Sequence, residues 1–138
     1  KEGCDTKYST DQVLIDEYGL TLKPSQDMYV TFEGISNAYI DTMACRGISA
    51  AGPTVEFRSF SVAGIGGGWA FYHPVESTIW INTDEEDIVL ERDCRTDIEA
   101  LKHEFVHHLL HMNEASEESR GHSSSLFNKC SVGVDTYY

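Results

Sequence analysis

Two histidines and a glutamate in the last third of the chain have the spacing of a catalytic zinc site. In the segment His103-Glu104-Phe105-Val106-His107, the histidines are four residues apart. On a helix this spacing places both imidazoles on one face, where a single tetrahedral zinc ion can bind both. Glu104 follows the first histidine, so its carboxylate can take a proton from zinc-bound water while the ion polarises a carbonyl group. The pattern predicts zinc-dependent hydrolysis with Glu104 as general base.

A catalytic zinc ion needs a third protein ligand and keeps its fourth position for water. His111 is a poor candidate, because its Cα lies about 12 Å along the helix from that of His103. His122 is the preferred candidate, since it follows a polar segment long enough to reverse the chain and precedes apolar residues that can anchor the returning segment. The alternatives are Glu117 or Glu118 on a following helix, or no third ligand.

The residues around the motif predict a helix with a sheltered histidine face. Thr96 to Glu99 has the form of a capping box and begins a helix that ends near Met112. An apolar stripe on this helix faces the core, almost opposite the histidines; it consists of Ile98, Leu101, Phe105, Leu109 and Met112. Ala100, Val106 and Leu110 make the flanks of the histidine face apolar too. We therefore expect the histidines to line a cleft and not a solvated surface.

Strands and shorter helices are predicted before this helix. In chain order they are a helix over 10–18, a strand over 28–33, a helix over 36–46, a bulged strand over 54–62 and hairpin arms over 69–73 and 78–82. The length suits one compact domain over residues 1–138. The expected fold class is α+β, with a small twisted, mostly antiparallel-edged sheet packed on the active-site helix.

The first hairpin arm is the expected substrate-binding strand. An open edge with small residues allows a substrate backbone to add as a further strand, which predicts contacts from Trp69, Ala70 and Phe71. A purely structural hairpin is the alternative. Four side chains are candidates for stabilising an oxyanion, and the spacing selects none of them: Tyr72, His111, Arg120 and Tyr137.

Charge and cysteine content bound the partners and the compartment. The formal net charge is −13, so nucleic acid is an unfavourable partner, and no apolar run is long enough to span a bilayer. The four cysteines are widely spaced without a C-x-x-C pair; they are Cys4, Cys45, Cys94 and Cys130. Two disulfides are the simplest interpretation and predict a secreted, periplasmic or cell-surface protein; four reduced, buried thiols are the alternative.

The motif and its continuation resemble the zincin metallopeptidases of the SprT-like group. Fourteen residues separate His107 from His122, which follows Gly121, and Phe127 stands five positions further on. In that group HExxH is followed at similar spacing by Gly-His and an aromatic residue. The resemblance implies a minimal zincin-like layout with an edge strand over the cleft, His103, His107 and His122 as ligands, and Glu104 as base. The acidic chain departs from the DNA-directed members, which are intracellular and carry basic regions.

The sequence thus predicts a secreted or extracytoplasmic zinc metallopeptidase, expected to be a monomeric endopeptidase with a peptide or protein substrate. Two other functions use the same residues. A non-catalytic zincin-like binding module is one, although it has no need of a base such as Glu104 beside the metal. A zinc hydrolase of a non-peptide amide is the other, and it differs only in substrate.

Overall fold

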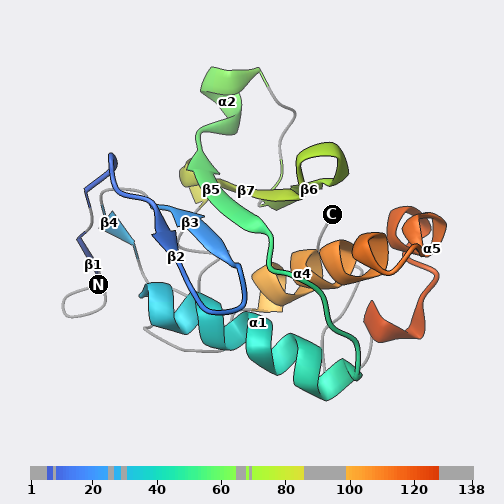
Figure 1. Ribbon diagram of the computed structural model, residues 1–138. Helices are drawn as coiled ribbons and strands as arrows, with labels where there is room; N and C mark the ends of the chain where they lie inside the picture. Colours follow the sequence, from blue (N-terminus) through green and yellow to red (C-terminus); the bar gives the residue numbers. More distant parts are fainter. Residues whose placement is uncertain are drawn as a thin grey trace.

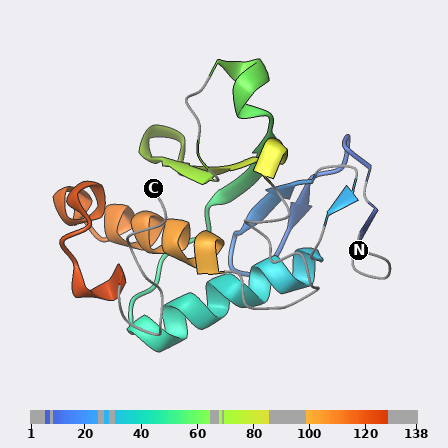
Figure 2. The same cartoon turned by 180° about the vertical axis from the view of Figure 1, so that it is seen from behind.

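The chain folds as a mixed sheet with two long helices against one face. The computed structural model describes residues 6–7, 9–24, 27–28, 31–64, 68, 70–85 and 99–127. Within these ranges both helices and strands are present, which confirms the predicted α+β composition. Figures 1 and 2 show the two long helices, α1 and α4, side by side on the same side of the sheet.

The sheet has five strands in the order β2-β3-β5-β7-β6. Their bounds are Leu14–Ile15 (β2), Thr21–Lys23 (β3), Thr54–Arg58 (β5), Thr78–Asn82 (β7) and Ala70–His73 (β6). The inner pairs β3–β5 and β5–β7 are parallel, whereas β2–β3 and β6–β7 are antiparallel. Both outermost pairs are therefore antiparallel, and β6 is an edge strand of this sheet. A separate antiparallel pair joins β1 (Thr6–Lys7) to β4 (Asp27–Met28).

The predicted hairpin is confirmed. Strands β6 and β7 pair with Ala70 opposite Ile81, and a short 3-10 helix, η1 (Pro74–Glu76), connects them. Ser77 ends the connection with a positive φ of 50°. The short connection makes β6 and β7 neighbours, and β6 forms the edge of the sheet next to α4 (Figure 1).

The long helices have clear local signals. Helix α1 (Phe32–Arg46) begins where the Thr31 hydroxyl accepts a hydrogen bond from the Gly34 amide and ends at Gly47, which has a φ of 68°. The helix predicted over 36–46 is therefore confirmed and starts four residues earlier. Helix α4 (Glu99–Met112) carries the histidine motif; the start predicted at residues 96–98 lies outside the described residues. Helix α5 (Ser116–Gly121) and the 3-10 helix η3 (Ser125–Phe127) follow it.

The main core lies between the sheet and the two long helices. Sheet residues and the α1 side chains meet three residues of the predicted α4 stripe, Leu101, Phe105 and Leu109, all fully buried. Met112 was also predicted in this stripe, but this last residue of α4 is 44% exposed. A second cluster joins Val106 and Leu110 to Phe127. Helix α4 thus packs against the main core on one side and against Phe127 on another, and the face between them carries His103 and His107.

Two predictions near the start of the chain are wrong. Residues 10–18 form turns and the short strand β2, not a helix, because the Asp16 carboxylate accepts from the amides of Tyr18 and Leu20 at 2.8 and 2.9 Å and holds a turn. Of the strand predicted over 28–33, Met28 belongs to β4, residues 29–30 lie outside the described residues, and Phe32 already belongs to α1. In both places a local side-chain hydrogen bond to the main chain sets the structure.

The strand predicted over 54–62 is shorter and has no bulge. Strand β5 ends at Arg58, and Ser59 caps the short helix α2 (Phe60–Ala63) by accepting from the Val62 amide. The change in apolar spacing near Ser59 therefore marks a switch from strand to helix. A second 3-10 helix, η2 (Thr83–Glu85), follows β7.

The cysteine and membrane predictions concern parts of the chain that the structure describes only partly. Cys45 lies on α1 and is disulfide-bonded, whereas Cys4, Cys94 and Cys130 lie outside the described residues. The connectivity and the oxidising compartment therefore stay predictions. No helix in the described ranges is long and apolar enough to cross a membrane.

Candidate metal centre

Helix α4 presents the three residues of the predicted motif to one interior face. His103, Glu104 and His107 are only 0%, 1% and 7% exposed. The helical spacing brings the rings of His103 and His107 to a centroid distance of 4.9 Å. Because polar side chains are rarely buried without a polar partner or a ligand, these buried residues form a candidate functional site, and their burial excludes a solvated helix face.

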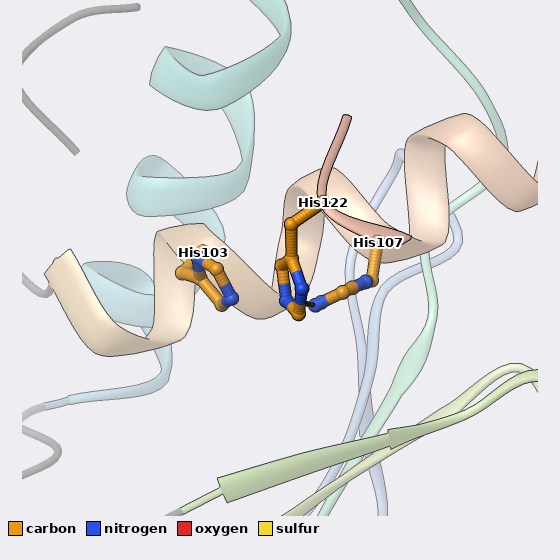
Figure 3. Close-up of side chains that lie close together, drawn as sticks. All are labelled: His103, His107 and His122. Atoms are coloured by element: carbon orange, nitrogen blue, oxygen red, sulfur yellow. Dashed lines mark hydrogen bonds between the residues drawn. The ribbon is translucent and has the colours of Figure 1, made fainter. Parts of the chain in front are cut away.

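His122 returns to the same point, as predicted. It ends helix α5 with a positive φ of 56°, a left-handed conformation that turns the chain back toward α4. The ligating atoms of His103, His107 and His122 all lie within 4.8 Å of one another, and Figure 3 shows the three rings converging. The Nε2 atoms of His107 and His122 are 3.1 Å apart. Two nitrogens of a tetrahedral zinc site, each about 2.05 Å from the ion, lie about 3.3 Å apart, so this spacing suits one shared cation.

Glu117 and Glu118, the alternative third ligands, do not join this cluster. Both side chains are exposed on α5, and the cluster contains only the three histidines. Among the described residues, this is the one group of three or more His, Cys, Asp or Glu side chains close enough to hold a metal ion. The nature of the donor set, three imidazoles, fits zinc among the common divalent ions.

Phe127 forms a fixed backing for the three histidines. Its buried ring lies 5.0, 4.8 and 5.0 Å from the ring centroids of His103, His107 and His122. The segment that carries Phe127 is held in turn by Arg46, whose Nε donates to the Leu126 carbonyl at 2.9 Å. The aromatic residue five positions beyond His122 thus limits how far each imidazole can turn.

Ser119 orients the imidazole of His107. Its buried hydroxyl lies 2.9 Å from His107 Nδ1 and donates to the His107 carbonyl at 3.2 Å. Since the hydroxyl hydrogen is used on the carbonyl, the oxygen accepts from Nδ1–H. Nε2 of the neutral ring then keeps its lone pair for a metal ion, which is the usual outer-shell arrangement around a histidine ligand.

The carboxyl group of Glu104 is buried, and one of its two oxygens has no hydrogen-bond partner among the described residues. Burial raises its pKa well above the ordinary value of 4.5, and a hydrogen bond from the main chain of Tyr72 opposes the rise. Among the described residues, Oε1 of Glu104 has no hydrogen-bond partner. An unsatisfied buried carboxyl oxygen is costly, and it is common where a substrate or a water molecule completes the site.

A cavity of about 750 Å³ opens on this site. Its lining comes from α4 and α5 on one side and from β6 and η1 on the other, and comprises Phe71, Tyr72, Pro74, Val75, Glu104, His107, His111, Ser116, Ser119, Arg120 and His122. Phe71, Pro74 and Val75 make the strand side apolar, whereas Arg120 brings a positive charge to the helix side. The size falls within the range typical of ligand-binding sites.

The substrate-binding and oxyanion candidates are only partly gathered at this cavity. Phe71 lines it and is 41% exposed, whereas the Ala70 side chain is buried in the core. His111 and Arg120 line the cavity and remain candidates for an oxyanion. Two predicted residues, Trp69 and Tyr137, lie outside the described residues.

Tyr72 lines the cavity, but its hydroxyl is engaged with a neighbouring core residue. The oxygen lies 3.0 Å from Nδ1 of His108, so the hydroxyl is engaged inside the protein. Burial raises the Tyr72 pKa, and a hydrogen bond with the Ser77 side chain opposes the rise. These contacts remove Tyr72 from the oxyanion candidates.

Sequence reasoning missed two residues that support the site, Ser119 and His108. His108 is buried, its Nε2 lies 2.7 Å from the Ala51 carbonyl, and burial lowers its pKa. The position of His108 directly after His107 in the sequence does not indicate that its ring contacts the Ala51 carbonyl and the Tyr72 hydroxyl. The only available signal was for Ser119, which is three residues before His122 and so lies on the preceding helical turn.

Comparison with known proteins adds no family to this description. No protein-family model, no curated protein and no solved structure matches the chain. The geometry of the site and the chemistry of its residues therefore carry the functional argument.

Proposed function

We propose that this chain is a zinc-dependent peptide hydrolase. The observation that carries the proposal is the buried carboxyl group of Glu104 beside three histidines whose ligating atoms lie within 4.8 Å of one another. Glu104, His107 and His122 also line one cavity, so a ligand in it meets the base and the metal site together. The fold and ligand spacing that this function would share with SprT-like zincins belong to the same proposal.

The residues present fit a catalytic zinc ion better than a structural one. His103, His107 and His122 would hold it, and three protein ligands would leave a fourth position for water. A zinc ion bound in this way supplies a lowered pKa for water and polarisation of a carbonyl group. Structural zinc sites are instead closed by four protein ligands, most often including cysteine.

Glu104 is suited to the role of general base. Burial raises its pKa, so its carboxylate is a stronger base toward water than an exposed carboxylate is, and the protonated group can then pass its proton to a leaving amine. His111 and Arg120 line the same cavity and can donate hydrogen bonds to negative charge that develops on a carbonyl oxygen. Together these side chains supply the proton transfer and the charge stabilisation that amide hydrolysis needs.

The edge strand β6 favours a peptide as the substrate. It lies beside the cavity and, in the described part of the chain, pairs only with β7. Apart from the Tyr72 amide, which bonds Glu104, the main-chain groups on its other side can pair with an extended backbone. Phe71, Pro74 and Val75 then offer an apolar wall to one substrate side chain. The acidic chain and its predicted disulfides suit an extracytoplasmic enzyme acting on proteins, without a nucleic-acid partner.

Metal analysis and a peptide library test the proposal. We expect one zinc per chain and chelator-sensitive cleavage of the library. Glu104→Gln should retain the zinc and lose cleavage by at least about a hundredfold, because removal of a general base costs on the order of 10² to 10⁴ in rate. Glu117→Gln is the matched control, since this exposed glutamate lies outside the cavity lining and should leave both measurements unchanged.

The third ligand is tested separately. His122→Ala should lower zinc occupancy sharply, and an unchanged zinc content would exclude His122 as a ligand. Full cleavage by Glu104→Gln would refute the assigned base. Stoichiometric zinc without cleavage of any peptide would instead favour the binding module, or an amide substrate that is not a peptide.

A further inference from the structure

His108 connects three separate parts of the fold. It lies on α4 directly after His107, but its ring turns into the core, where it is 1% exposed. Nε2 lies 2.7 Å from the Ala51 carbonyl in the segment before β5, and Nδ1 lies 3.0 Å from the Tyr72 hydroxyl on β6. Both ring nitrogens are thus used in contacts between elements that are far apart in the sequence.

The direction of these hydrogen bonds follows from the groups involved. A carbonyl oxygen can only accept, so Nε2 of His108 carries a hydrogen and donates to Ala51. In the neutral ring Nδ1 is then the acceptor, and the Tyr72 hydroxyl donates to it. The histidine therefore binds the strand and the segment before β5 at the same time.

Tyr72 is the residue through which β6 meets the candidate site. Its ring lies parallel to that of His107, with centroids 6.4 Å apart and an interplanar angle of 6°. It also meets the ring of His111 edge to face at 6.1 Å. Its main-chain N–H donates to the Glu104 carboxyl group. Because β6 is an edge strand, this N–H can point away from the sheet and toward α4.

We propose that His108 is a positioning residue that fixes β6 across the cavity from α4 and, through Tyr72, orients the carboxyl group of Glu104. The side chain of Tyr72 is held by His108, so its amide is held in place for one carboxyl oxygen. Oε1 of Glu104 is left without a hydrogen-bond partner among the described residues and is the oxygen available for reaction. An effect of His108 on the rate of cleavage rests on the proposed function, whereas its effect on the position of β6 does not.

Two substitutions of His108 separate its two contacts. In His108→Asn the amide oxygen lies near the position of Nδ1, so it can still accept from Tyr72. In His108→Gln the amide nitrogen lies near the position of Nε2 and can still donate to Ala51, while the contact with Tyr72 is lost. Tyr72→Phe breaks the same contact from the other side and keeps the ring. The matched control is Tyr39→Phe, which removes a buried hydroxyl that lies 2.9 Å from the Ala50 carbonyl and 3.4 Å from the Ala51 carbonyl. It loosens the segment that His108 also binds but leaves the contact between His108 and Tyr72 intact.

Amide hydrogen exchange of the zinc-loaded protein measures the position of β6 without any need for activity. We expect the residue 72 amide to exchange about fivefold faster in His108→Gln and Tyr72→Phe, which is the effect of one lost hydrogen bond on local opening. The double variant should show no further increase, because both changes remove the same contact. His108→Asn and Tyr39→Phe should leave this amide within about twofold of the unchanged chain.

Kinetics on the best peptide of the library provide the second measurement. His108→Gln and Tyr72→Phe should lower kcat about fivefold with zinc content unchanged, whereas a purely structural role would lower only thermal stability. An exchange rate at residue 72 that is the same in Tyr72→Phe as in Tyr39→Phe would overturn the inference. If the unchanged chain cleaves no peptide, the proposed function fails, and the exchange rates alone still decide whether His108 positions β6.

Discussion

Replacing Ser119 with alanine tests how the protein orients its candidate metal ligands. The serine hydroxyl accepts from Nδ1 of His107 at 2.9 Å and donates to the His107 carbonyl at 3.2 Å. Ser119→Ala removes both contacts but adds no bulk, since alanine is smaller. The ring of His107 is then less restrained and can place its hydrogen on either nitrogen, including the nitrogen that faces the candidate metal site.

The expected loss in zinc affinity follows from these two contacts. One neutral hydrogen bond contributes about 1 kcal/mol, and a hydrogen bond to a metal-ligating histidine typically contributes a factor of 10 to 100 in metal affinity. Phe127 also restrains the ring of His107, at a centroid distance of 4.8 Å, so part of the orientation survives the substitution. We therefore expect the lower end of this range, a loss of about tenfold.

Competition between the protein and a chromophoric chelator measures this loss at fixed pH. The matched control is Ser116→Ala on the same helix, because the Ser116 hydroxyl bonds a histidine that is not a ligand, His111, at 3.1 Å. We expect Ser116→Ala to bind zinc as the unchanged chain does. Equal affinities for the Ser119→Ala and Ser116→Ala proteins would refute the assigned role of Ser119 and weaken the case that His107 binds through Nε2.

Two further predictions concern the scaffold. A Cβ on Gly52 would lie 2.5 Å from the Leu20 main-chain nitrogen, so Gly52→Ala should lower the free energy of unfolding by roughly 2 kcal/mol in urea titrations. Gly121→Ala is the control and should not lower it, because no atom lies within 4 Å of a Cβ at that position. Burial raises the pKa of Tyr39 well above its ordinary value of 10, so the native state keeps a proton that the unfolded state loses. The free energy of unfolding should fall by up to about 1.4 kcal/mol per pH unit above pH 10, and less steeply in Tyr39→Phe; equal slopes would contradict this.

The ligand cluster was predictable because its geometry is largely local. The spacing of His103 and His107 fixes their separation on any α-helix. His122 required only that the polar segment after α4 reverse the chain, and α5 does so, with His122 itself in a left-handed conformation directly after it. The buried face of α4 was predictable for a similar local reason. Side chains three or four residues apart lie on the same side of a helix, so the apolar pattern indicates which side faces the core.

The upstream elements were harder to predict where one side chain bonds the nearby main chain. The Asp16 carboxylate holds a turn in a stretch whose apolar spacing suited a helix. Thr31 and Ser59 begin helices in stretches whose composition suited strands. Serine, threonine and aspartate favour caps and turns, but each of them can also lie within a strand or a helix. The composition of a segment therefore cannot locate the residue at which a helix or strand begins.

The histidines of α4 show where a spacing argument ends. His103, His107, His108 and His111 are the same residue type within nine positions of one helix. The HExxH pattern selects His103 and His107 as candidate ligands, because Glu104 follows His103; His107 and His111 have the same spacing of four without such a glutamate. It is silent on His108, because the partners of His108 are a strand hydroxyl and a loop carbonyl 36 and 57 residues away. Sequence can therefore predict which side chains could hold an ion, whereas the width of the cavity beside them depends on contacts that exist only once the sheet and helix have packed.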